Sequence, residues 1–273
     1  MRKKLLPISF LLLGWLLSSC TTSPRITAIL TAPSDSVFSA QKYNVAELEQ
    51  KYPKQPYVDL LSKRTFEHSA MINQGHFEDW KFHTIVIERY VILNPDNTDA
   101  STVTFHASKE SQLNSIYTLY KSPSGKITRF ARNNFSSTTD EAGMVKYVLN
   151  IPATEKGALV EQACDFTVSG LSKDSRMEFN FNLQREHPIE NLEMNFLFPE
   201  WWNIQVKNNV PYEKLPIVEK TDDDHNKRII TYKANMLPAV RLEAFAPFYR
   251  ANSPYIELHS RSIMSKEPEK SLS

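Results

Sequence analysis

Apolar and polar residues alternate along much of this chain, from about Tyr57 onward. The alternation is clearest in residues 177–183, 192–196 and 202–206, where each apolar side chain is followed by a polar one. A period of two is typical of strands that have one buried face and one solvated face. The run from His83 to Leu93 is instead apolar on both faces, so it predicts a central strand.

Turn-forming residues separate these strand patterns, and helical spacing is scarce. The turn candidates are Asn94-Pro95-Asp96-Asn97, Ser122-Pro123-Ser124-Gly125 and Asn208-Asn209-Val210-Pro211. Asn44, followed three residues later by Glu47, predicts the start of one short helix over Val45–Lys51, which Pro53 ends. We therefore predict an all-β fold, a large antiparallel β-sandwich with one short N-terminal helix.

The N-terminus has the pattern of a bacterial lipoprotein signal. Three basic residues precede an apolar stretch from Leu5 to Leu17, which is too short to span a bilayer comfortably. Ser18 and Ser19 then precede Cys20, and small residues before a cysteine are what a lipoprotein signal peptidase requires. The pattern predicts that residues 1–19 are removed and that Cys20 is lipidated. An ordinary secretory signal, or a membrane anchor that happens to hold a cysteine, is the alternative.

These observations predict an envelope protein that acyl chains hold to the membrane. Diacylglycerol and palmitate are the usual groups on such a cysteine. Thr21 favours the outer membrane in a Gram-negative host, because Asp at this position usually retains a lipoprotein in the inner membrane. Residues 20–41 are rich in Ser, Thr, Ala and Pro and predict a flexible tether. The sandwich is expected over residues 42–262, with a candidate sub-boundary near 170–175 and a disordered tail over 263–273.

Charge and cysteine usage narrow the classes of function. The 273 residues include 32 Lys and Arg against 31 Asp and Glu, and no basic patch stands out, so a nucleic-acid partner is not expected. The chain has two cysteines. Because lipidation would consume Cys20, Cys164 has no partner for an intrachain disulfide, and the fold must be stabilised by packing.

Cys164 and the histidines are weak candidates for catalysis or metal binding. Cys164 falls in phase with Val160, Phe166 and Val168, which predicts a buried and inert thiol. The seven histidines show no paired spacing, and the acidic run at residues 222–225 is better explained as a solvated hairpin tip than as a calcium loop. We predict no catalytic residue, no metal and no cofactor.

Aromatic side chains are the remaining candidates for binding. Trp202 is in phase with Ile204 and Val206 and should lie in the core, whereas the adjacent Trp201 should point to the other side. Trp201, together with Phe248 and Tyr249 near Pro247, could stack on a sugar or anchor a protein partner. The alternative is that these rings cover the end of the sandwich.

The order of several segments resembles the β-rich domain of unknown function 3857, which in many bacterial proteins precedes a transglutaminase-like domain. The likeness spans roughly Pro56 to His259 and is carried by residues 88–94, 120–126, 150–161 and 238–256. Ser124 stands where that family usually has Asp, and the chain ends soon after the matching region. The resemblance thus implies a fold and an accessory role, with no activity to carry over.

The sequence as a whole favours a non-catalytic, membrane-anchored accessory module that binds a protein, peptide or glycan partner, by strand addition or on one face. Two alternatives stay open. One is a cysteine-dependent hydrolase or acyl transferase related to transglutaminase-like enzymes. The other is a purely structural scaffold of the envelope.

Overall fold

A computed structural model describes residues 35–73, 76–171, 178–183, 185–200, 202, 204–208, 217–222, 227–240 and 255–260. Most of these residues lie in strands of three sheets, and the described part of the chain contains only three short α-helices. The predicted all-β sandwich is therefore confirmed. No helix within the described ranges is long and apolar enough to cross a membrane.

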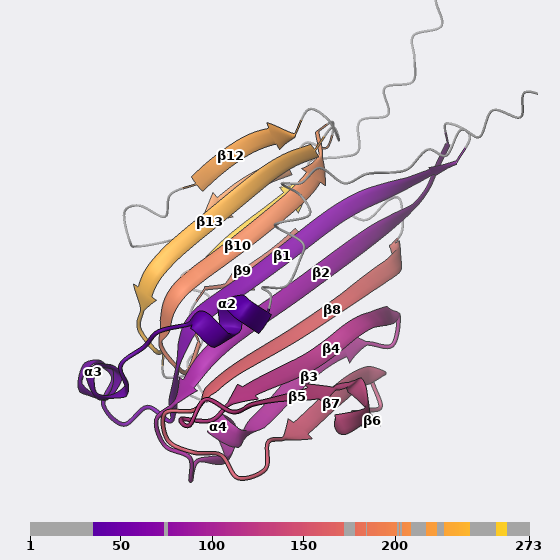
Figure 1. Ribbon diagram of the computed structural model, residues 1–273. Helices are drawn as coiled ribbons and strands as arrows, with labels where there is room; N and C mark the ends of the chain where they lie inside the picture. Colours follow the sequence, from indigo (N-terminus) through magenta and orange to yellow (C-terminus); the bar gives the residue numbers. More distant parts are fainter. Residues whose placement is uncertain are drawn as a thin grey trace, which may run out of the picture.

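The largest sheet has eight strands and runs across the whole molecule (Figure 1). Its order is β12 (Ile217–Asp222), β13 (Lys227–Leu237), β10 (Ile189–Pro199), β1 (Tyr57–Asn73), β2 (His76–Ile92), β8 (Leu159–Leu171), β4 (Ser111–Lys121) and β5 (Ile127–Ala131). Strand β2 lies between β1 and β8, which confirms the central strand predicted from His83 to Leu93. Strands that begin before residues 170–175 and strands that follow them share this sheet, so the sheet extends across the candidate sub-boundary.

Two three-stranded sheets cover one face of the large sheet, here called the groove face. One has the order β11 (Ile204–Asn208), β14 (Tyr255–Ser260), β9 (Glu178–Asn182), and the other β3 (Thr102–Ser108), β7 (Met144–Asn150), β6 (Ser136–Thr139). Met194 and Phe196 of β10 share a core with Ile256 of β14. Val160 of β8 shares a second core with Val103 and Leu149 of the other small sheet.

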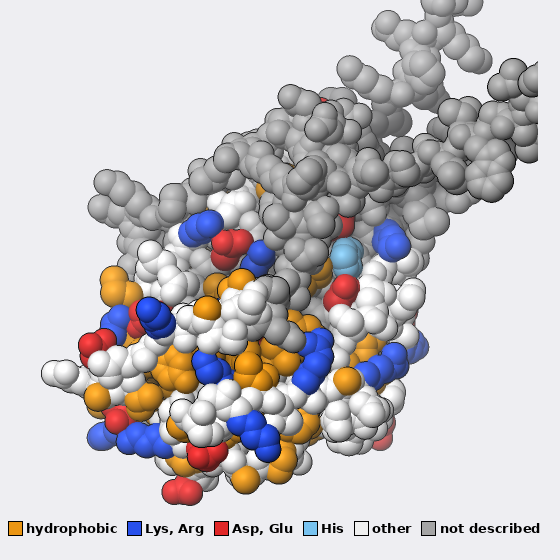
Figure 2. Space-filling model, in the orientation of Figure 1, with side chains coloured by type: hydrophobic (Ala, Val, Ile, Leu, Met, Phe, Trp, Pro, Cys, Tyr) orange, Lys and Arg blue, Asp and Glu red, His pale blue; other side chains and the backbone are white. Residues whose placement is uncertain are grey.

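The opposite face, here called the helix face, carries α2 (Asp35–Ala40) and α3 (Val45–Lys51). In Figure 1, α2 crosses in front of β1 and β2. Phe38 of α2 and Leu48 of α3 pack with Val91 of β2 and Leu159 of β8. The residues on either side of Val91 and Leu159 in the sequence point to the groove face, because side chains alternate along a strand. Figure 2 shows hydrophobic side chains gathered around the middle of the helix face, with charged residues around them.

Local sequence signals explain the shorter elements. The predicted helix over Val45–Lys51 is confirmed as α3, and the side chain of Asn44 accepts a hydrogen bond of 3.1 Å from the backbone N–H of Ala46. Helix α4 (Thr98–Ser101) starts in the same way at Asn97, and a 3-10 turn, η1, covers Arg132–Asn134. The predicted turn at residues 122–125 joins β4 to β5, where Gly125 has φ of +89°.

Two expectations need correction. The large sheet is mixed and not purely antiparallel, because β1 pairs with β10 in parallel from Asp59 beside Ile189 to Glu67 beside Leu197. The end of the predicted tether is also structured, since residues 35–40 form α2 and Phe38 is fully buried. Apart from Phe38, residues 35–40 are Asp, Ser, Val, Ser and Ala, a composition close to that of a linker, while the single Phe fixes the segment to the sheet.

Candidate functional site

A large groove lies over the middle of the groove face. Its volume is about 1440 Å³, and its floor is made by β1, β2 and β8. One wall comes from α4 and β3, and the other from Phe181 of β9 and residues 185–187. We call it the central groove. It lies between the two small sheets, with β3 of one sheet on one side and β9 of the other sheet on the opposite side.

Strand register sets the order of side chains along the floor. Tyr57 and Asp59 lie at one end of β1, followed by Arg64 and then Phe66. Arg64 is level with Val86 of β2, which is in turn level with Cys164 of β8. The next level holds Phe66, Thr84 and Phe166. The floor therefore changes from charged and polar at one end to aromatic at the other.

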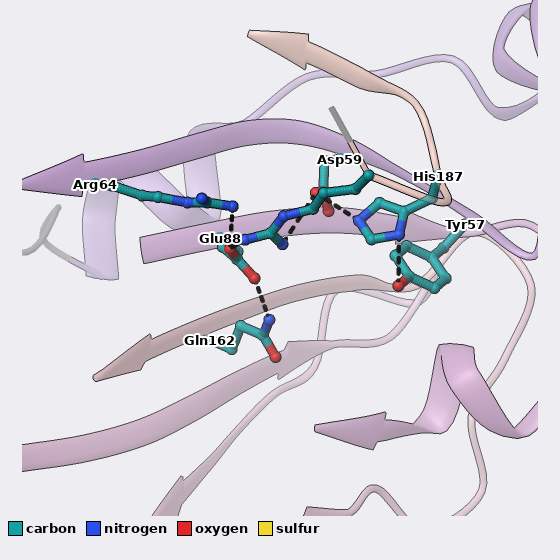
Figure 3. A network of polar contacts seen from close by, with 7 residues as sticks. Tyr57, Asp59, Arg64, Glu88, Gln162 and His187 are labelled. Carbon is teal, nitrogen blue, oxygen red and sulfur yellow. Dashed lines mark hydrogen bonds and ion pairs between the residues drawn. The ribbon is translucent and has the colours of Figure 1, made fainter. Parts of the chain in front are cut away.

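At the polar end, His187 joins Tyr57 to Asp59 (Figure 3). Its Nδ1 shares a hydrogen bond of 2.9 Å with the Tyr57 hydroxyl, and its Nε2 lies 3.0 Å from Oδ2 of Asp59. The Tyr57 and His187 rings pack with centroids 4.4 Å apart. Asp59 is only 1% exposed, so the histidine supplies the hydrogen bond that a buried carboxylate needs.

Glu88 is the centre of the second part of the network. Nη2 of Arg185 donates to its Oε1, and Nε2 of Gln162 donates to its Oε2 at 2.6 Å. Nη2 of Arg64 lies 3.8 Å from the same Oε1, and Nη1 of Arg185 lies 3.9 Å from Oδ2 of Asp59. Arg185 thus links the two buried carboxylates.

The two carboxylates have opposite pKa shifts although both are buried. Burial raises the pKa of Asp59, and the hydrogen bond from His187 offsets only part of this effect. Burial would also raise the pKa of Glu88, but the positive charges of Arg185 and Arg64 outweigh it and lower that pKa to about 2. Glu88 is therefore a stable anion, whereas Asp59 is the group closer to protonation.

Cys164 lines the central groove but lacks the surroundings of a nucleophile. It is 6% exposed and belongs to the core beneath β3 and β7, which confirms that it is buried on the apolar face. Burial, helped by the negative charges of Glu88 and Asp165, raises the pKa of its thiol to about 12. A reactive cysteine needs the opposite environment, with a cation or helix N-terminus that lowers the pKa.

The structure does not describe the other residues predicted for lipidation or binding. Cys20, Trp201, Phe248 and Tyr249 lie outside the described residues. Trp202 is buried in the core beside Phe198, as its phase predicted. The acidic run begins where β12 ends at Asp222, and β12 pairs with β13 as a hairpin. Among the described residues, no group of His, Cys, Asp and Glu is arranged to hold a metal ion.

Sequence reasoning missed the charged floor of the groove. Tyr57, Asp59 and Arg64 come from one strand, but Arg185 and His187 come from a segment far along the chain. One signal was present, because Glu88 and Arg89 interrupt the apolar run of β2. Charges in the middle of a central strand are expensive to bury, and so they indicate ion pairs or a site.

Comparisons with known proteins support the fold. No family model matches this chain, and no curated protein matches its sequence. A putative protease from Parabacteroides distasonis superposes with a TM-score of 0.61 at 13% identity, over 76% of this chain and 40% of that chain. This chain thus spans less than half of that protein. At such low identity the likeness shows the fold alone.

Two further structures match less well. Aminopeptidase A from Legionella pneumophila gives a TM-score of 0.42 at 7% identity, over 78% of this chain and 22% of that chain. Leukotriene A4 hydrolase from Saccharomyces cerevisiae gives 0.38 at 8% identity, over 84% of this chain and 33% of that chain.

Proposed function

We propose that this protein is a non-catalytic, lipid-anchored module of the bacterial cell envelope that binds a partner in the central groove. The observation that carries the proposal is the groove itself. Its volume of about 1440 Å³ exceeds the roughly 300–1,000 Å³ of pockets for small ligands, which favours an extended ligand.

The lining of the groove also supports binding. Asp59, Glu88 and Arg185 are held in a network of ion pairs and hydrogen bonds, so their positions are set before a ligand arrives. Fixed polar groups among apolar side chains are what give a binding site its specificity. A sheet that served only as a scaffold would not need buried charges along the groove, because apolar residues of similar volume stabilise a core equally well.

The cysteine-dependent alternative has less support. A thiol with a pKa of about 12 supplies almost no thiolate at neutral pH, and Cys164 is only 6% exposed at the groove. The accessory role agrees with the resemblance to the domain of unknown function 3857. The proposed anchor is Cys20, for the reasons given by the leader pattern, and the outer membrane is the proposed location in a Gram-negative host.

Site-specific photo-cross-linking in the producing bacterium tests this proposal. A benzophenone amino acid replaces exposed His106 on β3 at the groove, or exposed Thr138 on β6 as the matched control. We expect a discrete cross-linked product from position 106 and none from position 138. The second substitution Thr104→Trp, which fills the groove from the same strand, should abolish the product. Equal products from both positions, or a product that persists with Thr104→Trp, would contradict binding in the groove.

A further inference from the structure

The walls of the central groove are strand edges. In the described sheets, β3 pairs only with β7, and β9 pairs only with β14. Thr102, Thr104 and His106 of β3 line one side of the groove, and Phe181 of β9 lines the other. A strand edge offers a row of backbone N–H and C=O groups, and an extended peptide can pair with such a row. The groove therefore suits a peptide better than a globular or purely apolar ligand.

Arg64 stands out on the floor because one of its buried N–H groups makes no hydrogen bond. Its Nε is buried and has no hydrogen-bond partner, and its guanidinium comes no closer than 3.8 Å to Glu88, the sole ion-pair partner found for it among the described residues. Arg185 already satisfies Glu88 with a direct hydrogen bond. Leaving a buried N–H donor such as this Nε without a partner costs free energy.

The surroundings of Arg64 favour an anion. Burial, and to a smaller extent the positive charge of Arg185, lowers the pKa of Arg64 to about 10. A carboxylate placed against the guanidinium would accept two parallel hydrogen bonds and relieve both effects. On the side away from Glu88, the next level of the floor holds Phe66 and Phe166, so an apolar side chain fits next to that carboxylate.

We propose that the central groove binds an extended peptide whose carboxylate is held by Arg64 and whose main chain pairs with the edge of β3 or β9. This inference rests on the proposed function and adds the chemical class of the ligand. The carboxylate belongs either to the C-terminus of the peptide or to an acidic side chain, and both offer the same two oxygens to the guanidinium.

Fluorescence anisotropy with the full-length lipidated protein in detergent micelles distinguishes these sources. The probes are three pools of N-terminally labelled hexapeptides with mixed apolar and small residues. The first pool has a free C-terminal carboxylate, the second is C-terminally amidated, and the third is amidated but contains one Asp. We expect the first or the third pool to bind at least tenfold more tightly than the second. The pool that does so identifies the source of the carboxylate.

Variants test the two contacts separately. Arg64→Gln should weaken binding of the carboxylate pool at least tenfold, while Arg64→Lys should recover part of the loss and Arg132→Gln, at an exposed position on η1, should have no effect. Circular dichroism establishes that each variant is folded. N-methylation of alternate backbone amides in the peptide should also weaken binding, because it removes the donors needed for strand pairing.

The failure of this inference is distinguishable from the failure of the proposed function. Equal affinity for the carboxylate and amidated pools, or unchanged affinity in Arg64→Gln, overturns the peptide–carboxylate inference. So does the absence of binding by all three pools. If cross-linking from position 106 still depends on the groove, or if an acidic oligosaccharide competes with it, the proposed function stands with a different ligand.

Discussion

On the helix face of the large sheet, His83 lies between two carboxylates. Its Nε2 is 2.8 Å from Oδ1 of Asp165, and its Nδ1 is 3.3 Å from Oε2 of Glu67. Lys227 from β13 also contacts Glu67, and Asn114 from β4 donates to Asp165 at 2.7 Å. The hydrogen bonds to Asp165 and Glu67 raise the pKa of His83 to about 9. This histidine therefore carries a proton at neutral pH.

The raised pKa predicts a loss of stability at alkaline pH. A pKa that is higher in the folded state gives stability that is complete below the unfolded value of 6.5 and is lost as the pH rises through about 9. We expect the His83 contribution to fall by about 2 kcal/mol between pH 6.5 and pH 10, a value discounted because the side chain is partly exposed. Urea unfolding of the parent and His83→Gln at both pH values measures it. An equal pH dependence in the two proteins would contradict this role.

The raised pKa of the Cys164 thiol leads to a second prediction at the scale of the residue. With a pKa of about 12, only about one thiol in ten thousand is a thiolate at pH 8. A disulfide reagent should therefore leave the folded protein unlabelled over hours and label it rapidly after unfolding in guanidinium. In the proposed lipoprotein, Cys20 is lipidated and contributes no thiol in either state. Rapid labelling of the folded protein would revive the cysteine-dependent enzyme.

At the scale of the element, α2 is fixed to the sheet by both apolar and polar contacts. Phe38 is fully buried against the helix face, with the guanidinium of Arg89 5.8 Å from the centre of its ring. Arg89 donates to Glu161 at 2.5 Å and 3.1 Å, and Gln41, directly after α2, accepts from Arg89 at 2.8 Å. The helix thus covers a buried ion pair that would otherwise face solvent.

We predict that Phe38→Ala lowers the free energy of unfolding by about 3 kcal/mol, because it removes a buried ring and leaves a cavity over the ion pair. The matched control is Val37→Ala, since Val37 is the adjacent residue and is 51% exposed. Its effect should stay within about 0.5 kcal/mol. Guanidinium unfolding measures both variants. Equal effects of the two substitutions would mean that α2 is not docked through Phe38.

The sequence could predict strands and faces, but not which strands meet. Alternation placed Phe196 and Val160 on buried faces because each strand carries its own pattern of apolar positions. The parallel pairing of β1 with β10 had no such signal, since the same alternation fits parallel and antiparallel neighbours. That pairing brings Ile189 beside Asp59 and so places His187 at the groove. The site could not be predicted without it.

At the scale of the whole molecule, docking of α2 shortens the connection to the proposed anchor. The sequence predicts a tether over residues 20–41, but residues 35–40 of that range form α2. Residues 21–34 connect Cys20 to α2, and a chain of that length spans at most about 50 Å when fully extended. In the proposed lipoprotein, α2 would therefore be held within about 50 Å of the membrane surface.

The anchor itself is open to a direct test. We expect Cys20→Ala to lose incorporation of labelled palmitate and to move from the membrane pellet to the soluble fraction or to remain as the unprocessed precursor. Cys164→Ala is the matched control, since it removes the second of the two cysteines and should leave lipidation unchanged. Fractionation and a palmitate label measure both. Normal maturation of the Cys20→Ala variant would contradict the lipoprotein assignment.

The parallel pairing of β1 with β10 also sets the order in which the molecule can assemble. Strands β1 and β2 are neighbours in sequence and can form a hairpin early during synthesis. The other edge of β1 stays unpaired until residues Ile189 to Leu197 of β10 have been synthesised. Until then the nascent hairpin has a long edge of unpaired backbone N–H and C=O groups. Incompletely synthesised chains would aggregate through this edge. A holding chaperone would be needed most at that edge and during that interval.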